Sequence, residues 1–395
     1  MYAPSSRFDE DAILARARSA DGLEDFGDEE FREPLRVLLR AYADAPIHDL
    51  GAKILEGSVV RSLANRLRAN HWFASYPEIA EEVLEAPLVV VGMMRSGTTL
   101  IQRLLASDPR HYCTMGWESL EPAPRLGVKP TDVDPRIADA DSREQMTREF
   151  AAEYFSIHPS YARQAEEEIM FLADAFLSHV PEASCDVPEY RAYIDAQDFA
   201  PAYRYLRRML QLLQWEKKRR GEHRGRWVLK TPAHLGYLDT LIATFPDAQV
   251  IHMHRDPVDT IPSGASLNAT LWRMHAADVD PAEIGRQWIA RMSWTNGRAM
   301  AVRNEMSDGA TRFTDVRFGA AVEDPIGQIQ RIYHRTGIEL HDDARDAMAT
   351  WLEKYAKQTL SKHRYTAEQF GLTEDQIRAA FADYAARFLT AKEKA

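Results

Sequence analysis

The sequence predicts an α/β protein whose core is a parallel sheet of about five strands flanked by helices. The first observation is PLVVVG (87–92), a β-branched apolar run typical of a strand buried on both faces. The second is the glycine loop and helix directly after it, because strand, loop and helix form the first unit of such a sheet. The third is the recurrence of this pattern at WVLK (227–230), AQVIHMHR (248–255) and FTDVRF (313–318).

The part of the chain before the first strand, residues 1–85, is expected to form an N-terminal helical region. Leu35, Leu38, Leu39 and Tyr42 recur at helical spacing and predict one apolar helix face. Charged residues separate the apolar ones along this segment. The sequence leaves three roles open for these helices: a cap, a substrate lid, or the surface of a homodimer.

Residues 86–395 are expected to form an α/β domain with a large helical insertion at about 109–226. Residues 109–140 are rich in proline and charge and predict a long loop, whereas residues 141–221 predict helices. Methionine and aromatic residues are frequent in the insertion. They would suit the lining of an apolar pocket or simply the core of the insertion. The tail from Asp342 also predicts helices.

The composition excludes several classes of protein. The 49 Lys and Arg residues against 60 Asp and Glu residues give a net charge of −11, which argues against a nucleic-acid-binding protein. The two cysteines, Cys113 and Cys185, are too few for a disulfide framework and fit a reducing compartment. The most apolar stretch, Pro87 to Met94, is far shorter than the roughly 20 residues of a membrane span. We therefore expect a soluble, cytoplasmic protein.

The clearest chemical motif is the loop between the first strand and its helix, Gly92-Met93-Met94-Arg95-Ser96-Gly97-Thr98-Thr99. It has the frame of a phosphate loop, in which backbone N–H groups and the positive end of the helix converge on an anion. Nucleoside triphosphatases place a lysine between the second glycine and the Ser or Thr of this loop. Here Thr98 stands in the place of that lysine, between Gly97 and Thr99. The basic residue is Arg95. The loop is therefore better suited to a single phosphate that carries another group than to a triphosphate with magnesium.

Two further basic residues stand at the ends of predicted strands. Arg255 ends the strand 248–255, Ser263 follows eight residues later, and Lys230 ends the strand 227–230. Ligands of open parallel sheets bind at the carboxyl ends of the strands. An arginine fork with a hydroxyl suits a second phosphate group. The alternative for Arg255 is a pairing with a neighbouring aspartate that caps a helix, and the sequence does not decide between the two.

With these motifs the chain resembles the sulfotransferase family that uses 3′-phosphoadenosine 5′-phosphosulfate as donor. It is most similar to the bacterial branch with an RSGTT loop, which is related to the tyrosyl-protein and carbohydrate enzymes. The segments DVRFGAAVEDPIGQIQRIYHRTGI and HRYTAEQFGLTEDQIRAAFADYAARF also look like this branch, so the resemblance covers about residues 86–388. It implies a five-stranded parallel sheet and no metal.

The resemblance also implies roles for individual residues. The loop Arg95 to Thr99 would hold the 5′-phosphosulfate, Arg255 and Ser263 the 3′-phosphate, and Lys230 would be a catalytic lysine. By position only, Arg364 would be a third phosphate contact. The first candidate for the general base is Glu118, which lies 23 residues after Arg95.

Other polar residues leave the assignment of the base open. Glu121 and His158 are the competing candidates. The glutamate run 166–168 predicts the charged start of a helix. His252 and His254 share one face of a strand, and without a third ligand at a telling spacing they are expected to pack in the sheet or the substrate crevice rather than to bind metal.

The expected reaction is in-line transfer of a sulfuryl group to a hydroxyl or amine of a small acceptor, which can be hydrophobic. The first alternative is a kinase or nucleotide hydrolase with a degenerate phosphate loop. The second is a non-catalytic nucleotide-binding member of the family. Catalysis of sulfuryl transfer needs mainly positioning and charge stabilisation, which Arg95 and Lys230 would supply.

Overall fold

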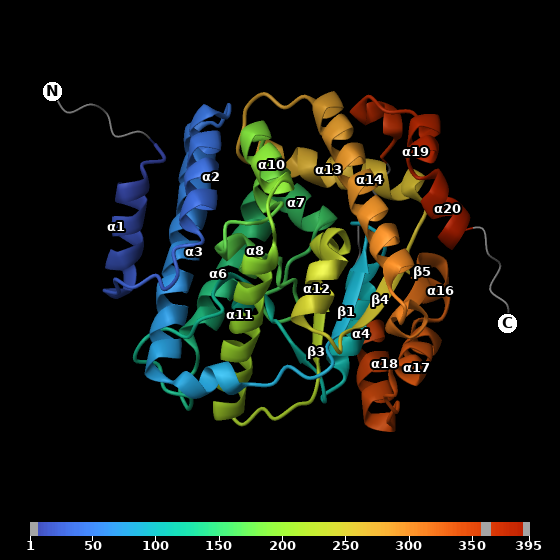
Figure 1. The fold of residues 1–395 in the computed structure, drawn as a ribbon, viewed down its shortest axis with the longest axis horizontal. Helices are drawn as coiled ribbons and strands as arrows, with labels where there is room; N and C mark the ends of the chain where they lie inside the picture. Colours follow the sequence, from blue (N-terminus) through green and yellow to red (C-terminus); the bar gives the residue numbers. More distant parts are fainter. Residues whose placement is uncertain (1–6, 357–364, 390–395) are drawn as a thin grey trace.

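The computed structural model describes residues 7–356 and 365–389 and is built around one parallel sheet (Figure 1). The strands are β1 (Leu88–Gly92), β2 (Tyr112–Cys113), β3 (Trp227–Lys230), β4 (Gln249–His254) and β5 (Phe313–Arg317). Their order is β2-β3-β1-β4-β5, and every neighbouring pair is parallel. The predicted α/β fold with about five strands is confirmed, and β1 lies in the centre with every residue buried.

The alternation of side chains along β1 divides the core into two layers. Leu88 and Val90 belong to one apolar cluster, which includes residues of α4 (Thr98–Ser107), α17 (Pro325–Thr336) and α18 (Asp342–Ala356). Val89 and Val91 belong to a larger cluster on the other face. That cluster includes residues of α11 (Ala200–Arg219), α12 (Leu238–Thr244), α13 (Pro257–Arg273), α14 (Pro281–Glu305), α19 (Glu374–Ala380) and α20 (Ala382–Phe388). The sheet is thus covered on both faces, as buried parallel strands require.

The N-terminal helices are α1 (Glu10–Asp21), α2 (Arg32–Asp44) and α3 (Asp49–Ser75). Leu35, Leu38, Leu39 and Tyr42 are all buried, so the predicted apolar face of α2 is confirmed. In Figure 1 these helices stand at the end of the molecule away from the sheet, beside α10 (Pro188–Asp195) and α8 (Ile169–Asp174). Their apolar residues join the larger core cluster, so they pack against the insertion rather than against the strands.

The insertion differs from its sequence-based description in one respect. The stretch 109–140, expected as a loop, contains β2, α5 (Gly116–Leu120) and the start of α6 (Pro135–Phe150). Pro135 begins α6, because proline suits the first turn of a helix. The Asp134 side chain caps this helix by accepting a hydrogen bond from the Arg136 N–H. The remaining helices are α7 (Ala152–Ile157), α9 (Val180–Ser184), α15 (Gly309–Arg312) and α16 (Phe318–Glu323). Three 3₁₀ turns complete the structure, at Pro77–Glu81, Pro232–Tyr237 and Ala367–Phe370.

None of the described helices combines the length and the apolarity that a membrane crossing needs.

Candidate active site

The phosphate loop lies between β1 and α4. Gly97 has φ +90°, and a Cβ atom at this position would lie 2.7 Å from the Phe318 ring, so the turn and the close packing both require glycine. Ser96 is buried and its hydroxyl donates a hydrogen bond of 2.6 Å to the Met93 carbonyl, which closes the loop. Thr98 and Thr99 open α4, where the first backbone N–H groups have no partner within the helix. The loop therefore offers its donors to an anion.

Arg95 stands in the same loop with φ +70°, a left-handed conformation that is strained for a residue other than glycine. Its Nε donates to Ser263 Oγ over 3.1 Å, and its Nη1 donates to the Ile157 carbonyl over 2.9 Å. Burial lowers the pKa of Arg95, and the charge of Arg255 adds to the effect, but an arginine stays protonated. The loop thus carries a desolvated, fixed positive charge.

Arg255 follows β4 and faces the same loop. Its Nη1 donates to the Arg95 carbonyl over 3.0 Å, and its guanidinium lies 4.2 Å from the Phe318 ring centroid. Its Nε is buried without a hydrogen-bond partner among the described residues, and the nearest carboxylate oxygen, on exposed Asp259, is 3.5 Å away. Asp256 caps α13 by itself, since its side chain accepts from the Val258 N–H. The structure therefore brings Arg95, Arg255 and Ser263 together and leaves donors of Arg255 available.

Lys230 ends β3 and is only 1% exposed. Its Nζ lies 2.5 Å from Glu167 Oε1, and its backbone N–H donates to Glu168 Oε2 over 3.0 Å. The other oxygen of Glu168 lies 2.8 Å from His234 Nε2. The glutamate run leads directly into α8, and Glu168 is the N-cap residue of this helix, as the sequence predicts. The run also places two carboxylates at the end of the strand.

Glu167 is the carboxylate of this group that lines the cavity described below. Burial alone raises the pKa of Glu167, but the charges of Lys230 and His158 outweigh burial and hold this pKa below the ordinary glutamate value. His158 also lines the cavity, directly after Ile157, whose carbonyl receives Arg95. Its Nδ1 is buried without a hydrogen-bond partner in the described part of the chain. Sequence reasoning missed Glu167, because only its pairing with the lysine distinguishes it from its neighbours.

Glu118, the first candidate for the general base, is buried and paired. It is 1% exposed, one carboxylate oxygen pairs with Lys217, and the other accepts the Met115 N–H over 2.8 Å. Burial raises the pKa of Glu118, although Lys217 opposes this. Its side chain is not part of the cavity wall. The carboxylate serves instead as a buried partner of α11 and closes the first turn of α5.

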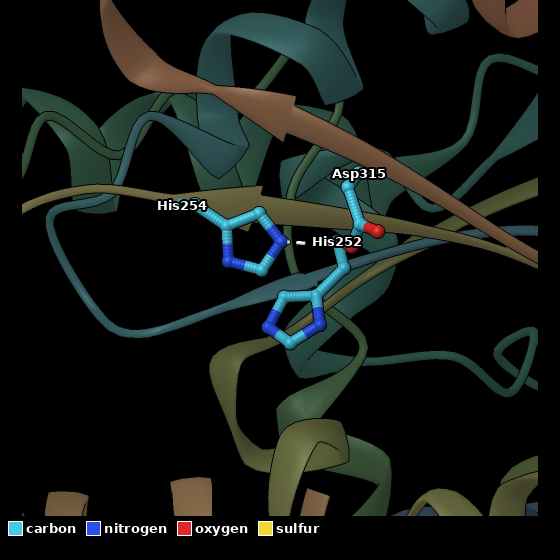
Figure 2. A group of neighbouring side chains, drawn as sticks. All are labelled: His252, His254 and Asp315. Carbon is cyan, nitrogen blue, oxygen red and sulfur yellow. Dashed lines mark hydrogen bonds and ion pairs between the residues drawn. The ribbon is translucent and has the colours of Figure 1, made fainter. Parts of the chain in front are cut away.

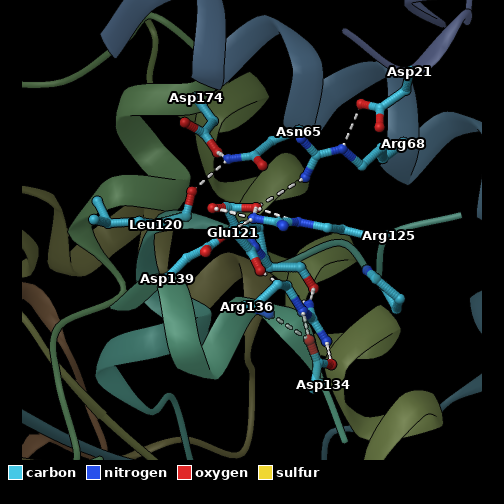
Figure 3. Close-up of polar contacts among 12 residues, drawn as sticks. Asp21, Asn65, Arg68, Leu120, Glu121, Arg125, Asp134, Arg136, Asp139 and Asp174 are labelled. Atoms are coloured by element: carbon cyan, nitrogen blue, oxygen red, sulfur yellow. Dashed lines mark hydrogen bonds and ion pairs between the residues drawn. The ribbon is translucent and has the colours of Figure 1, made fainter. Parts of the chain in front are cut away.

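Glu121 is likewise held away from the cavity wall, in a polar network that ties the insertion to α3 (Figure 3). It pairs with Arg68 at 3.4 Å, Arg125 at 2.9 Å and Arg143 at 3.3 Å. Arg68 and Arg125 extend the network to two aspartates, Asp21 and Asp139. With its carboxylate occupied by three arginines, Glu121 is not available to accept a substrate proton. Arg364 lies outside the described residues, and its contact with a phosphate stays a prediction.

A large cavity of about 1370 Å³ borders the phosphate loop, Arg255, Glu167 and His158. Lys230 is not part of the cavity wall and lies behind Glu167, with which it pairs. One end is lined by Arg95, Gly97, Thr98, Thr99, Arg255 and Ser263. The rest of the wall carries apolar and aromatic side chains of the insertion, α13 and α14, among them Tyr154, Met170, Val180, Leu271, Trp288 and Met292. It also includes the paired polar residues His179, Glu182 and Arg291. Some aromatic and methionine residues of the insertion thus line the cavity, such as Tyr154 and Met170. Others, such as Phe171 and Phe176, are buried in the core of the insertion.

His252 and His254 lie together with Asp315 on the adjacent strand β5 (Figure 2). Their ligand atoms are within 4.8 Å of one another, close enough to share a metal ion. The guanidinium of Arg303 already pairs with both oxygens of Asp315, at 2.6 and 2.9 Å, and lies 3.0 Å from His252 Nδ1. Burial lowers the pKa of both histidines, so they are neutral at pH 7. Arg303 therefore supplies the positive charge that pairs with Asp315, and the three residues fit a packed polar cluster in the sheet.

Comparisons with known proteins identify the family of the chain. Residues 87–343 match a family model described as "Sulfotransferase family". The crystal structure of sulfotransferase STF1 from Mycobacterium tuberculosis H37Rv has a TM-score of 0.83 and 31% identity, and the match covers 96% of this chain and 100% of that one. Sulfotransferase STF9 from Mycobacterium avium has the same fold, with a TM-score of 0.87 and 24% identity over 100% and 99% of the two chains. Omega-hydroxy-beta-dihydromenaquinone-9 sulfotransferase Stf3 of Mycobacterium bovis is 25% identical over 305 residues, which are 75% of this chain and 74% of that protein.

Proposed function

The chain belongs to the sulfotransferase family, and from this premise we propose that it transfers a sulfuryl group from 3′-phosphoadenosine 5′-phosphosulfate to a hydroxyl or amine of an apolar acceptor. The observation that carries the proposal is the pairing of two anion-binding centres at one end of the cavity. One is the loop with Arg95 at the start of α4, and the other is Arg255 with Ser263. A nucleotide with both a 5′- and a 3′-phosphate would occupy both centres.

The residues fit such a donor. The buried Nε of Arg255 has no hydrogen-bond partner among the described residues, and a phosphate oxygen would give it one. Arg95 holds Ser263 and Ile157 in the described state and would exchange these contacts for the phosphosulfate. The donor supplies a sulfuryl group on a good leaving phosphate, so the loop needs no lysine for a third phosphate and no metal.

The step is an in-line displacement. The acceptor atom forms a bond to sulfur while the bond from sulfur to the 5′-phosphate oxygen breaks. Arg95 and Lys230 stabilise the charge on the departing oxygen. We assign the general base to Glu167 in place of Glu118, because Glu167 lines the cavity and lies next to Lys230. The ion pair with Lys230 keeps the carboxylate ionised, so it can take the acceptor proton, although the lowered pKa makes it a weaker base. His158 is the second candidate on the same wall.

The apolar end of the cavity supports a hydrophobic acceptor. The name of the relative Stf3 gives a hydroxylated dihydromenaquinone as the acceptor of that protein. For this chain we propose an alcohol on an apolar body. The net charge of −11 disfavours a highly sulfated glycan, which the surface would repel. The two cysteines are free and buried, which suits the proposed cytoplasmic location.

The test is direct turnover. The enzyme is incubated with the phosphosulfate donor in EDTA and with alcohols of graded apolarity, and sulfated product is followed by mass spectrometry. We expect product with apolar alcohols and none with ATP and magnesium in place of the donor. Phosphorylated product from ATP, or donor that is bound but never turned over with any acceptor, would refute the proposal.

A further inference from the structure

Three large apolar side chains of the cavity wall are exposed, and two of them lie on one helix while the third, Val322, lies on α16. Met146 is 54% and Phe150 is 85% exposed, and both belong to the cavity wall. They lie four residues apart on α6, so they neighbour each other on one helix face. We call this pair the lip. Single exposed apolar residues are common on protein surfaces and need no explanation. Exposed apolar residues that also line a cavity indicate a binding surface for an apolar ligand.

The wall of this one cavity includes both the lip and His158. Thr147 lines it beside the lip, followed by Tyr154 and then His158. The rings of Tyr154 and His158 stack with centroids 5.9 Å apart. The carbonyl of Ile157, directly before His158, accepts a hydrogen bond from Arg95. An acceptor whose hydroxyl lies at the transfer site can therefore extend along this wall to the surface.

Several of the charged residues beside the lip form ion pairs. Arg148 bridges to Glu144 at 2.6 Å, and Arg163 bridges to Asp141 at 2.6 Å. Arg143, which lines the cavity one turn before the lip, is held by Glu121. The other charged residues of this stretch, Glu149 and Glu153, are exposed and acidic, so the rim disfavours an anionic ligand and is compatible with an uncharged apolar chain.

We propose that the lip carries the apolar chain of the acceptor where it leaves the cavity, so the acceptor is a long-chain amphiphile rather than a compact alcohol. This inference rests on the proposed sulfotransferase function and names its substrate class. The hydroxyl head lies at Glu167 and Arg95, and the chain crosses Met146 and Phe150. Contact with the chain then adds binding energy that a short alcohol cannot gain.

The experiment compares two acceptors with the same alcohol head, one with a short chain and one with a long chain. The variant is Met146→Ser with Phe150→Ser. We expect kcat/KM for the long acceptor to fall about tenfold or more, and that for the short acceptor to stay within about twofold. The matched control is Leu50→Ser with Ile54→Ser, an exposed apolar pair with the same spacing on α3 that is not part of the cavity wall. It should leave both acceptors unchanged.

Equal losses for the two acceptors, or no loss for the long one, would overturn the inference. A change in oligomeric state by light scattering without a change in acceptor preference would also overturn it and make the lip a contact between two copies. Failure of the proposed function is distinguishable, because the wild-type enzyme would then sulfate neither acceptor.

Discussion

Exchange of Glu167 for glutamine tests the assignment of the general base. Glutamine keeps the size of the side chain and an oxygen that can accept from Lys230, but it cannot take a proton. The matched control is Glu118→Gln, the same exchange on a buried carboxylate that also pairs with a lysine, Lys217, but lies away from the cavity wall. The two variants separate loss of the base from loss of a buried ion pair.

The expected size of the effect follows from the role. A general base contributes about 10²- to 10⁴-fold, or roughly 3–5 kcal/mol of the barrier, so kcat of Glu167→Gln should fall by that factor. Donor affinity should change by less than about threefold, because the anion-binding groups are untouched. Both variants weaken a buried ion pair and should lose stability, by up to about 3–5 kcal/mol each. Only Glu167→Gln should lose turnover per folded molecule.

The assay is single-turnover sulfuryl transfer with saturating donor, measured from about pH 3 to 8 and normalised to the folded fraction. Burial raises the pKa of Glu167, but the charges of Lys230 and His158 hold it below its ordinary value, so the acidic limb of the wild-type profile should lie below about pH 4.5. The limb should vanish in Glu167→Gln. An equal loss of turnover in Glu118→Gln, or an acidic limb near pH 6.5 that persists in Glu167→Gln, would refute the assignment and favour a histidine base.

Three further predictions concern charge. Lys230→Met should lower kcat at least about a hundredfold while donor binding stays within about threefold, measured by turnover and calorimetry; unchanged turnover would remove the lysine from the mechanism. Arg255→Ala should weaken binding of 3′-phosphoadenosine 5′-phosphate about 10- to 100-fold and leave the affinity for 5′-AMP nearly unchanged. An equal loss of affinity for both ligands would show that Arg255 does not recognise the 3′-phosphate. Asp174 is fully buried, and burial raises its pKa to about 6, so the native state binds this proton more tightly than the unfolded state. The free energy of unfolding therefore falls by about 3 kcal/mol as pH rises from about 4 to 6. In urea unfolding at pH 7, Asp174→Asn should be more stable than the wild type by up to this amount. A less stable variant would contradict the predicted direction of the effect.

Local sequence was enough to predict the sheet and the grouping of Arg95, Arg255 and Ser263. PLVVVG and the glycine loop after it carry their fold signal in consecutive residues. Arg255 and Lys230 could be placed from sequence because parallel strands deliver their carboxyl ends to one edge. Ser263 could be placed because it lies two helical turns after that edge, and the structure brings it to 3.1 Å from Arg95.

The base and the insertion could not be predicted in the same way. Glu118, Glu121 and Glu167 are similar in sequence, and the difference between them is which cation each one meets in the folded chain. Glu167 meets Lys230 at the cavity, whereas Glu118 meets Lys217 in the core. Pro135 gave a loop signal from sequence alone, but it begins α6 because Asp134 caps the helix.

The central claim is a metal-independent site for a nucleotide with a 3′-phosphate, and calorimetric binding of 3′-phosphoadenosine 5′-phosphate in EDTA and in magnesium tests it most directly. ATP and 5′-AMP serve as the comparison ligands. We predict tight binding in EDTA, unchanged by magnesium and sharply weaker for 5′-AMP. Absence of binding in EDTA, with ATP binding restored by magnesium, would contradict the account and show that the loop serves a triphosphate.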